Sequence, residues 1–244
     1  MKAMILAAGL GTRLRPFTND RPKALIKIGG IPLIDYVINK LKKFGISEII
    51  INTHHFAEQV SDSLRTKNNF NISIEITHEE RLLNTGGGLK NAGWFFDNSE
   101  PFVLYNTDVL SNIDLAAMLY VHKNTTALAT LAVRRRKTLR YFLFDEQDKL
   151  VGWESKASSE RRIVAEPEGD TSPLSFMGIH LISPKIFDLF IERGAFSIVD
   201  AYLRLAGEGH IIKAFHADEY AWLDLGRKGN LEKAERMVKA GAFE

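Results

Sequence analysis

The sequence predicts an α/β fold with a Rossmann-like, doubly wound, mostly parallel sheet flanked by helices. In its first half, short apolar runs alternate with segments of helical periodicity, which is typical of parallel strands joined by helical crossovers. A glycine-rich loop follows the first apolar run, and ligands of such sheets bind beyond the carboxyl ends of the strands. The length of 244 residues suffices for one large domain or two small ones.

The elements of the first half follow one another at regular spacing. An apolar strand at 3–6 precedes the glycine-rich loop. A helix is predicted from Pro32 to Phe44, with proline in its first turn and Gly45 as its stop. Apolar residues recur along it at the spacing of one helix face. The further elements expected are a strand at 48–52, a helix at 57–65, a strand at 72–76, a helix at 86–96 and a strand at 101–105.

The second half is less regular and predicts a small α+β part. We expect a strand at 126–133, a hairpin of 141–144 with 150–153, a loop-rich segment at 155–172, a strand at 175–182, and helices near 184–192 and 198–205. No internal repeat or linker interrupts the chain, so we expect residues 1–244 to form one domain with two halves, about 1–125 and about 126–244.

The composition is that of an ordinary soluble protein, with 45% apolar and 25% charged residues. A net charge of +2 gives no reason to expect nucleic-acid or membrane binding. The absence of cysteine excludes disulfides and thiolate metal sites. No apolar run approaches the roughly 18 residues of a membrane span, and the first motif leaves no room for a signal peptide. We therefore expect a cytoplasmic protein.

The loop after the first strand has the chemistry of a polyphosphate site. Gly9 and Gly11 let the backbone pass close to a ligand, and Arg13, Arg15 and Lys23 place positive charge nearby. A Walker A loop would need lysine followed by serine or threonine after the glycines, which is absent. The dinucleotide fingerprint would need glycine or alanine at position 14, where leucine stands.

A second polar motif, Asn106-Thr107-Asp108-Val109, ends a buried apolar run. A carboxylate at a strand end can hold Mg²⁺, which prefers oxygen ligands and nucleotide phosphates. Asp108 is therefore a candidate metal ligand. A third motif, Asn84-Thr85-Gly86-Gly87-Gly88, opens a predicted helix and offers backbone groups to a ligand.

The string L-A-A-G-x-G-T-R-L-x-P followed by R-P-K closely resembles the signature of sugar-1-phosphate nucleotidyltransferases. T-G-G-G-L, N-T-D-V, F-M-G-I at 176–179, and W-L-D-L-G at 222–226 before L-x-x-A-E together resemble the N-acetylmuramate-1-phosphate uridylyltransferases and their mannose-1-phosphate guanylyltransferase-like relatives. The resemblance extends over nearly the whole chain and implies the nucleotide-diphospho-sugar transferase fold. The acyltransferase extension of larger members is missing, so we expect no second acetyltransferase activity.

The resemblance implies a role for individual residues. Arg13 contacts the β- and γ-phosphates and the leaving pyrophosphate, Lys23 screens the repulsion between the reacting phosphates, and Asp224 joins Asp108 in holding Mg²⁺. The first half of the chain binds the nucleotide and the second half binds the sugar phosphate. The nucleotide-binding residues expected are Ala8, Gly9, Gly11, Thr12, Arg13, Gly86, Gly87 and Asn106.

The acceptor side departs more from the family pattern. Gly178 is expected to let a sugar hydroxyl approach the main chain, while Glu154, Lys156 and Glu166 are candidates for the sugar hydroxyls or the phosphate. The E-K-P acceptor motif of the family is absent as such. Thr107 replaces the glycine common in the family, and Arg227 stands where related enzymes commonly carry threonine.

The basic run Arg134-Arg135-Arg136-Lys137, with Arg140, is either a solvated strand exit or the place where one arginine binds an acidic group of the acceptor. The adjacent pair His54-His55 has no third ligand spaced to join it, so we expect no metal there.

The favoured substrates are UTP and N-acetylmuramate 1-phosphate or a related hexose 1-phosphate. Three alternatives remain open: a GTP-dependent mannose-1-phosphate guanylyltransferase, a cytidylyltransferase for a non-sugar phosphate, and a non-catalytic nucleotide-sugar-binding regulatory protein. A nicotinamide dehydrogenase is disfavoured by Leu14, which breaks the dinucleotide fingerprint, and by the cluster of Arg13 and Lys23. A monomer and a homodimer are equally compatible with the sequence.

Overall fold

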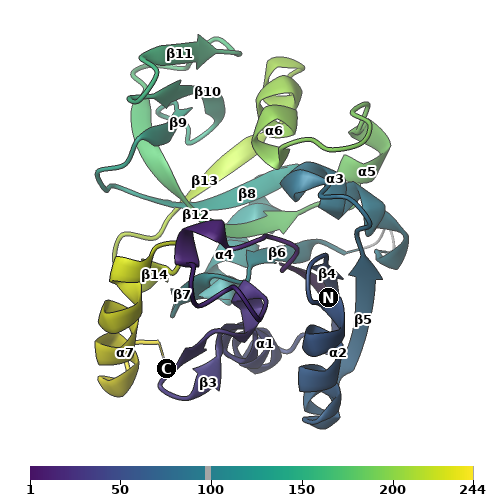
Figure 1. Cartoon of the computed structure of the whole chain (residues 1–244). Coiled ribbons are helices and arrows are strands. Elements are labelled where there is room, and N and C mark those ends of the chain that lie inside the picture. The colour runs from purple at the N-terminus through teal and green to yellow at the C-terminus, as the bar shows by residue number, and fades with distance from the viewer. Residues whose placement is uncertain (97–99, 244) are drawn as a thin grey trace.

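Four parallel strands form one side of the ten-stranded main sheet, in the spatial order β6-β1-β4-β5, with β5 at its edge (Figure 1). The computed structural model describes residues 1–96 and 100–243. The strands are β1 (Lys2–Leu6), β4 (Glu48–Thr53), β5 (Ser73–His78) and β6 (Phe102–Asn106). Ile5 of β1 lies in register with Ile51 of β4 and Tyr105 of β6. The carboxyl ends of these three strands therefore meet at one edge of the sheet.

Helices cover both faces of the sheet, because successive side chains of a strand point to opposite sides. Met4 and Ile50 share a hydrophobic cluster with residues of α3 and α6, whereas Ile5 and Ile49 share another with residues of α1, α2 and α4. These helices are α1 (Leu33–Lys43), α2 (Ala57–Arg65), α3 (Asn84–Asn91), α4 (Leu115–Asn124) and α6 (Ile198–Gly207).

The second half of the chain extends the sheet with mostly antiparallel strands. Strand β12 (Ser172–Ile182) is antiparallel to β6, β8 and β9, and β13 is parallel to β8. The further strands are β8 (Ala129–Arg134), β9 (Arg140–Phe144), β10 (Leu150–Ser155), β11 (Glu160–Ile163) and β13 (Ile212–His216). The predicted hairpin is confirmed by the pairing of β9 with β10. A parallel sheet with an α+β extension agrees with the predicted fold class.

Two small ladders and the last helix complete the structure. Strand β7 (Val109–Ser111) pairs with β14 (Trp222–Asp224), and β2 (Lys27–Ile28) pairs with β3 (Ile31–Pro32). Helix α7 (Leu231–Lys239) lies beside β14 in Figure 1 and shares a hydrophobic cluster with residues of β2, α1 and β14. Across residues 1–96 and 100–243, no helix is long and apolar enough to cross a membrane.

Several elements differ from the prediction. Strand β11 lies inside the segment predicted as loop-rich, and α4, β13 and α7 were not predicted. Helix α5 (Ile186–Leu189) is shorter than the predicted 184–192. Helix α3 begins at Asn84 and ends at Asn91, before the 3-10 helix η4 (Gly93–Phe95), in which a Cβ atom on Gly93 would lie 3.0 Å from the Phe187 ring. Asp114 caps α4 by accepting hydrogen bonds from the N–H groups of Ala116 and Ala117, a start signal visible in the sequence.

We predict that the folded protein loses stability in acid because two histidines, His122 and His180, are buried. His180 is bonded to the Tyr202 hydroxyl and His122 to the Thr130 hydroxyl, each at 2.9 Å. Burial lowers the pKa of His180 to about 3 and that of His122 to about 4, from an ordinary 6.5. Below pH 6.5 the unfolded chain therefore binds protons that the folded protein excludes, so stability falls as the pH drops.

We expect each histidine to lower the free energy of unfolding by up to ~1 kcal/mol per pH unit between pH 6.5 and 4.5. Urea unfolding of His180→Gln across this range should show a shallower slope than the wild type, whereas His55→Gln, at an exposed position, should not. An unchanged slope in His180→Gln would show that this histidine does not contribute.

Candidate active site

The predicted phosphate loop follows β1 directly. After Leu6 the chain turns through Gly11 into the 3-10 helix η1 (Thr12–Leu14). Gly11 has a φ of +63°, and a Cβ atom there would lie 2.9 Å from Cγ2 of Thr18. The Thr18 hydroxyl donates a hydrogen bond of 2.9 Å to the Gly11 carbonyl. Both the left-handed conformation and the close approach therefore require glycine.

A cavity of about 630 Å³ opens beside this loop and is called the loop cavity below. Eight predicted site residues line it: Ala8, Gly9, Gly11, Thr12, Arg13, Lys23, Asn106 and Asp108. Other lining residues include Asn52, Glu79, Leu82, Asn84, Thr85, Thr107, Ser197 and Gly226. A cavity of about 780 Å³ beside α1 contains none of the predicted site residues. We therefore place the candidate active site at the loop cavity.

Lys23 and Asp108 form an ion pair at this cavity. Lys23 opens the 3-10 helix η2 (Lys23–Leu25) directly after Pro22, and Asp108 lies between β6 and β7. Only 11% of the lysine side chain and 20% of the aspartate side chain are exposed. Removing either partner would leave a charge that is largely withdrawn from water, which is strongly destabilising.

Asp224 reaches the same place from the C-terminal part of the chain. In the ladder of β7 with β14 it lies opposite Val109, and the next N–H, of Leu225, donates to the Asp108 carbonyl at 2.8 Å. The Asp224 carboxylate accepts a hydrogen bond of 2.6 Å from the N–H of Gly226. A Cβ atom on Gly226 would lie 2.9 Å from Nη2 of Arg13. The structure thus brings all four predicted charged groups to one region.

Thr107 and Asn106 line the cavity next to Asp108. The Thr107 N–H donates to the Leu6 carbonyl at 3.2 Å, which ties the end of β6 to the end of β1. The Thr107 hydroxyl is buried and has no hydrogen-bond partner among residues 1–96 and 100–243.

Gly86 and Gly87 are buried and do not line the loop cavity. Their N–H groups both donate to the carbonyl of Phe196, at 3.0 and 3.2 Å. A Cβ atom on Gly86 would lie 2.3 Å from the Phe196 ring, and one on Gly87 would lie 2.5 Å from the Gly194 carbonyl. The N–H groups predicted to recognise the nucleobase are thus already bonded, and the neighbouring Asn84 and Thr85 line the cavity instead.

A buried polar pair in the wall of the cavity, Asn52 and Glu79, was not predicted from the sequence. The side-chain oxygen of Asn52 (Oδ1) accepts a hydrogen bond of 2.8 Å from the N–H of Ala7. The side-chain amide of Asn52 donates one of 2.7 Å to the Glu79 carboxylate. The second Glu79 oxygen accepts from the N–H of Leu83 at 2.9 Å. This pair fixes the phosphate loop relative to the turn before α3. The sequence does contain a pattern that indicates this role: Asn52 directly follows three isoleucines, near the carboxyl end of a strand, where ligands of such sheets bind.

The predicted acceptor residues do not gather at the loop cavity. Gly178, with a φ of +80°, does not line it but lies beside the lining residue Asn106, since a Cβ atom would come within 2.8 Å of the Asn106 amide. Glu154 is buried in β10 and forms an ion pair of 2.7 Å with Lys156. Glu166 is exposed in the segment between β11 and β12. None of the last three lines the loop cavity.

Within the basic run, Arg136 differs from its neighbours. The Arg134 guanidinium donates to the carbonyls of Asp218 and Tyr220, at 3.2 and 3.5 Å. The Arg136 guanidinium lies over the Trp222 ring, 4.6 Å from its centroid. Partial burial lowers the pKa of Arg136 and the negative charge of Asp224 opposes this shift. Arg136 therefore lies close enough to Asp224, a candidate metal ligand, for the two charges to interact.

His54 takes part in local structure, since its Nδ1 lies 2.7 Å from the Glu79 carbonyl oxygen. In the part of the chain that the structure describes, no three or more histidine, aspartate or glutamate side chains are grouped so that they could hold a metal ion. A metal at Asp108 and Asp224 would therefore need further oxygen ligands from substrates or water.

Comparisons with known proteins agree with this geometry. The chain is 31% identical to the N-acetylmuramate alpha-1-phosphate uridylyltransferase of Caulobacter vibrioides, over 98% of this chain and 97% of that protein. It is 27% identical to the mannose-1-phosphate guanyltransferase beta-A of Xenopus laevis, over 93% of this chain but 61% of that longer protein.

The fold is shared with solved structures. The inositol-1-phosphate CTP transferase from T. maritima superposes with a TM-score of 0.77 at 20% identity, over 99% of this chain and 97% of the other. The nucleotide-diphospho-sugar transferase fold predicted from the sequence is thereby confirmed.

A family model for nucleotidyl transferases matches residues 2–241, which is nearly the whole chain. The enzyme class predicted from the loop motif is confirmed, and the chain belongs to the nucleotidyl transferase family.

Proposed function

We propose that the protein transfers a uridylyl group from UTP to N-acetylmuramate 1-phosphate or a related hexose 1-phosphate, which yields a UDP-sugar and pyrophosphate. The observation that carries this proposal is the convergence of Arg13, Lys23 and Asp108 on the loop cavity, with Asp224 held next to Asp108 by the ladder of β7 with β14. The relative from C. vibrioides, which matches along almost its entire length, bears the name of this reaction and supports the choice of substrates.

The reaction we propose is an in-line attack by a phosphate oxygen of the acceptor on the α-phosphorus, with pyrophosphate as leaving group. The nucleophile is already anionic, so the chain needs no strong base. Its task is to hold the phosphates in line and offset their charge. Arg13 binds the β- and γ-phosphates, and Lys23 reduces the repulsion between the acceptor phosphate and the α-phosphate.

We propose Mg²⁺ as the cofactor, held by Asp108 and Asp224. The donor set fits a hard cation, because it consists of two carboxylates that the ladder of β7 with β14 brings to neighbouring positions. When bound, Mg²⁺ supplies charge that polarises phosphate oxygens. Lys23 compensates Asp108 in the absence of the ion.

We propose that residues 1–125 mainly bind the nucleotide and that residues 126–244 mainly bind the sugar phosphate. Ser197 and Gly226 also line the loop cavity, so the second half completes the nucleotide site. We further propose a cytoplasmic enzyme of cell-wall sugar metabolism that works as a monomer or a homodimer. Glu154, Lys156, Glu166 and Gly178 remain the proposed acceptor contacts.

Two other assignments have specific support. The guanylyltransferase relative supports GTP with mannose 1-phosphate. The other assignment is a cytidylyl transfer from CTP to a non-sugar phosphate. The solved inositol-1-phosphate CTP transferase shares the fold at 20% sequence identity. A regulatory protein without activity would be expected to have lost one of the four charged groups, and all four are present.

One assay separates these assignments. Pyrophosphate release should be measured with UTP, GTP, CTP and ATP, each combined with N-acetylmuramate, glucose and mannose 1-phosphates. We expect the highest kcat/KM for UTP with one of the hexose 1-phosphates. Preference for GTP with mannose 1-phosphate would favour the second assignment, and nucleotide binding without turnover on any pair would favour the regulatory protein.

Removing either candidate metal ligand should abolish most of the activity. We expect Asp108→Asn and Asp224→Asn each to lower kcat by about 10²–10³-fold, the scale of a lost charge-stabilising group. Asp62→Asn, on the exposed face of α2, is the matched control and should retain wild-type kcat. Near-full turnover of both variants at saturating Mg²⁺ would refute the metal assignment.

Arg136 is the arginine we propose to bind an acidic group of the acceptor. Its ring contact with Trp222 fixes the guanidinium, and the Trp222 indole N–H donates to the Met177 carbonyl at 2.8 Å, next to Gly178. No hydrogen bond or ion pair engages Arg136 within the described residues, so its donors are available to a carboxylate or phosphate.

Arg136→Ala should therefore raise the KM for N-acetylmuramate 1-phosphate about 10–100-fold, the range of one charge-assisted hydrogen bond. Arg135→Ala should leave this KM within about twofold of the wild type. If the effect comes from the lactyl carboxylate, the KM for N-acetylglucosamine 1-phosphate should change much less. Equal KM values for wild type and Arg136→Ala would disprove this role.

A further inference from the structure

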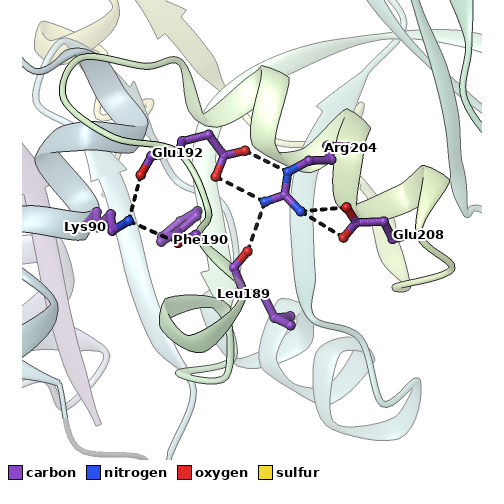
Figure 2. Close-up of polar contacts among 6 residues, drawn as sticks. All are labelled: Lys90, Leu189, Phe190, Glu192, Arg204 and Glu208. Carbon is purple, nitrogen blue, oxygen red and sulfur yellow. Dashed lines mark hydrogen bonds and ion pairs between the residues drawn. The ribbon is translucent and has the colours of Figure 1, made fainter.

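The segment between α5 and α6, residues 190–197, is wedged between α3 and α6 and is called the clasp loop here (Figure 2). Its two ends are held differently. The C-terminal end bonds to the turn that opens α3, and the N-terminal end bonds to charged side chains of α3 and α6.

The C-terminal end of the clasp loop is interlocked with residues 83–87. The Phe196 carbonyl accepts from the N–H groups of Gly86 and Gly87, while the Phe196 N–H donates to the Leu83 carbonyl at 3.0 Å. The N–H of Ile198 donates to the Thr85 hydroxyl at 3.0 Å. Because Thr85 and Ser197 both line the loop cavity, this interlock sets the shape of one cavity wall.

Contact between the two segments is also steric. The Phe196 ring occupies the space that a Cβ atom on Gly86 would need, and the Gly194 carbonyl occupies the corresponding space at Gly87. A displacement of the clasp loop would therefore both break the hydrogen bonds and leave a gap behind the turn.

The N-terminal end is held by Arg204 of α6. Its guanidinium donates to both carboxylate oxygens of Glu192, at 2.8 and 3.1 Å, and to the Leu189 carbonyl at 3.0 Å. Lys90 of α3 donates to the carbonyls of Phe190 and Glu192, at 3.0 and 2.6 Å. Figure 2 shows these bonds converging on the clasp loop from both helices.

The ion pair of Arg204 with Glu192 is protected from solvent. The two side chains are 23% and 20% exposed, and a bidentate pair of this kind is stronger than a typical surface ion pair. Burial raises the pKa of Glu192, but the hydrogen bonds that the carboxylate accepts and the charges of Arg204 and Lys90 together outweigh it, so the pKa is lowered overall. Glu192 therefore stays ionised and bonded at neutral pH.

Arg204 has a second partner that does not hold the loop. Glu208 lies one turn further along α6 and accepts from Arg204 at 2.8 and 2.9 Å. Its side chain is 47% exposed, and it is the C-cap residue of α6, the helix that carries Arg204. Glu208 can therefore serve as a control for Glu192, because both carboxylates bind Arg204 but only Glu192 belongs to the clasp loop.

We propose that Arg204 is a positioning residue for the nucleotide, which acts through Glu192 and the clasp loop to hold the 83–87 turn against the loop cavity. This role rests on the proposed function only in that the ligand of the cavity is a nucleotide. Arg204 itself touches no part of the cavity lining.

The first arm of the test needs no ligand. Amide hydrogen exchange is compared in the wild type, Glu192→Gln and Glu208→Gln. We expect the amides of Gly86 and Gly87 to exchange at least about tenfold faster in Glu192→Gln, since both depend on the Phe196 carbonyl. In Glu208→Gln they should exchange as in the wild type. Equal protection in all three proteins would overturn the proposal.

The second arm measures the Kd of UTP with Mg²⁺ by calorimetry, together with Tm. We expect Glu192→Gln and Arg204→Ala to raise the Kd about tenfold, while Glu208→Gln leaves it unchanged and Arg204→Lys restores part of the affinity. The KM of the acceptor should change less than that of UTP. A lower Tm with an unchanged Kd would reduce Arg204 to a purely structural role and overturn the proposal.

Failure of the proposed function has a different signature. A wild-type protein that binds none of the four nucleoside triphosphates would refute the function, whereas the exchange result would still decide whether Arg204 holds the turn.

Discussion

The ion pair between Lys23 and Asp108 is the constraint on which the rest of the candidate site depends. Two charges largely withdrawn from water are tolerated only when each compensates the other. Asp108 also accepts the N–H of Leu225 through its carbonyl, which ties β14 and Asp224 to the same residue. The N-terminal loop, the end of β6 and the C-terminal segment are therefore joined at one aspartate.

The opposite wall of the loop cavity is held by backbone contacts instead of charges. Gly86 and Gly87 allow the clasp loop to approach so closely that no side chain fits between the two segments. The Asn52 and Glu79 side chains then connect this turn to the phosphate loop through buried hydrogen bonds. One wall thus supplies charge that substrates can share, and the other supplies a fixed surface. A site of this kind positions a nucleotide with little rearrangement of the protein, which is the economical way to assist phosphoryl transfer.

The nucleotide side of the site was predictable because it depends on local backbone requirements. Gly11 is needed for a left-handed φ directly after β1, and Asp108 ends a buried run, so both carry signals within a few neighbouring residues. The role of Gly86 was not predictable, since it depends on Phe196, more than a hundred positions away. The same reason explains why β13 and α7 were missed, since β13 pairs with β8 and α7 packs against residues far from it in the chain. Strand β11 was missed for another reason: its four residues, Glu-Arg-Arg-Ile, are all exposed and show no apolar pattern, although they pair with the neighbouring β10.

The proposed acceptor side follows different physical rules. Its strands β9, β10 and β11 extend the sheet away from β12, and all four residues of β11 are exposed, where several residue types fit equally well. Arg136 looked like any other member of a basic run until the Trp222 ring beneath it and the nearby Asp224 singled it out. Such side chains can change without disturbing the Lys23–Asp108 pair or the glycine contacts. One scaffold can therefore retain nucleotidyl transfer while its acceptor changes, which agrees with relatives whose names specify different nucleotides and different sugar phosphates.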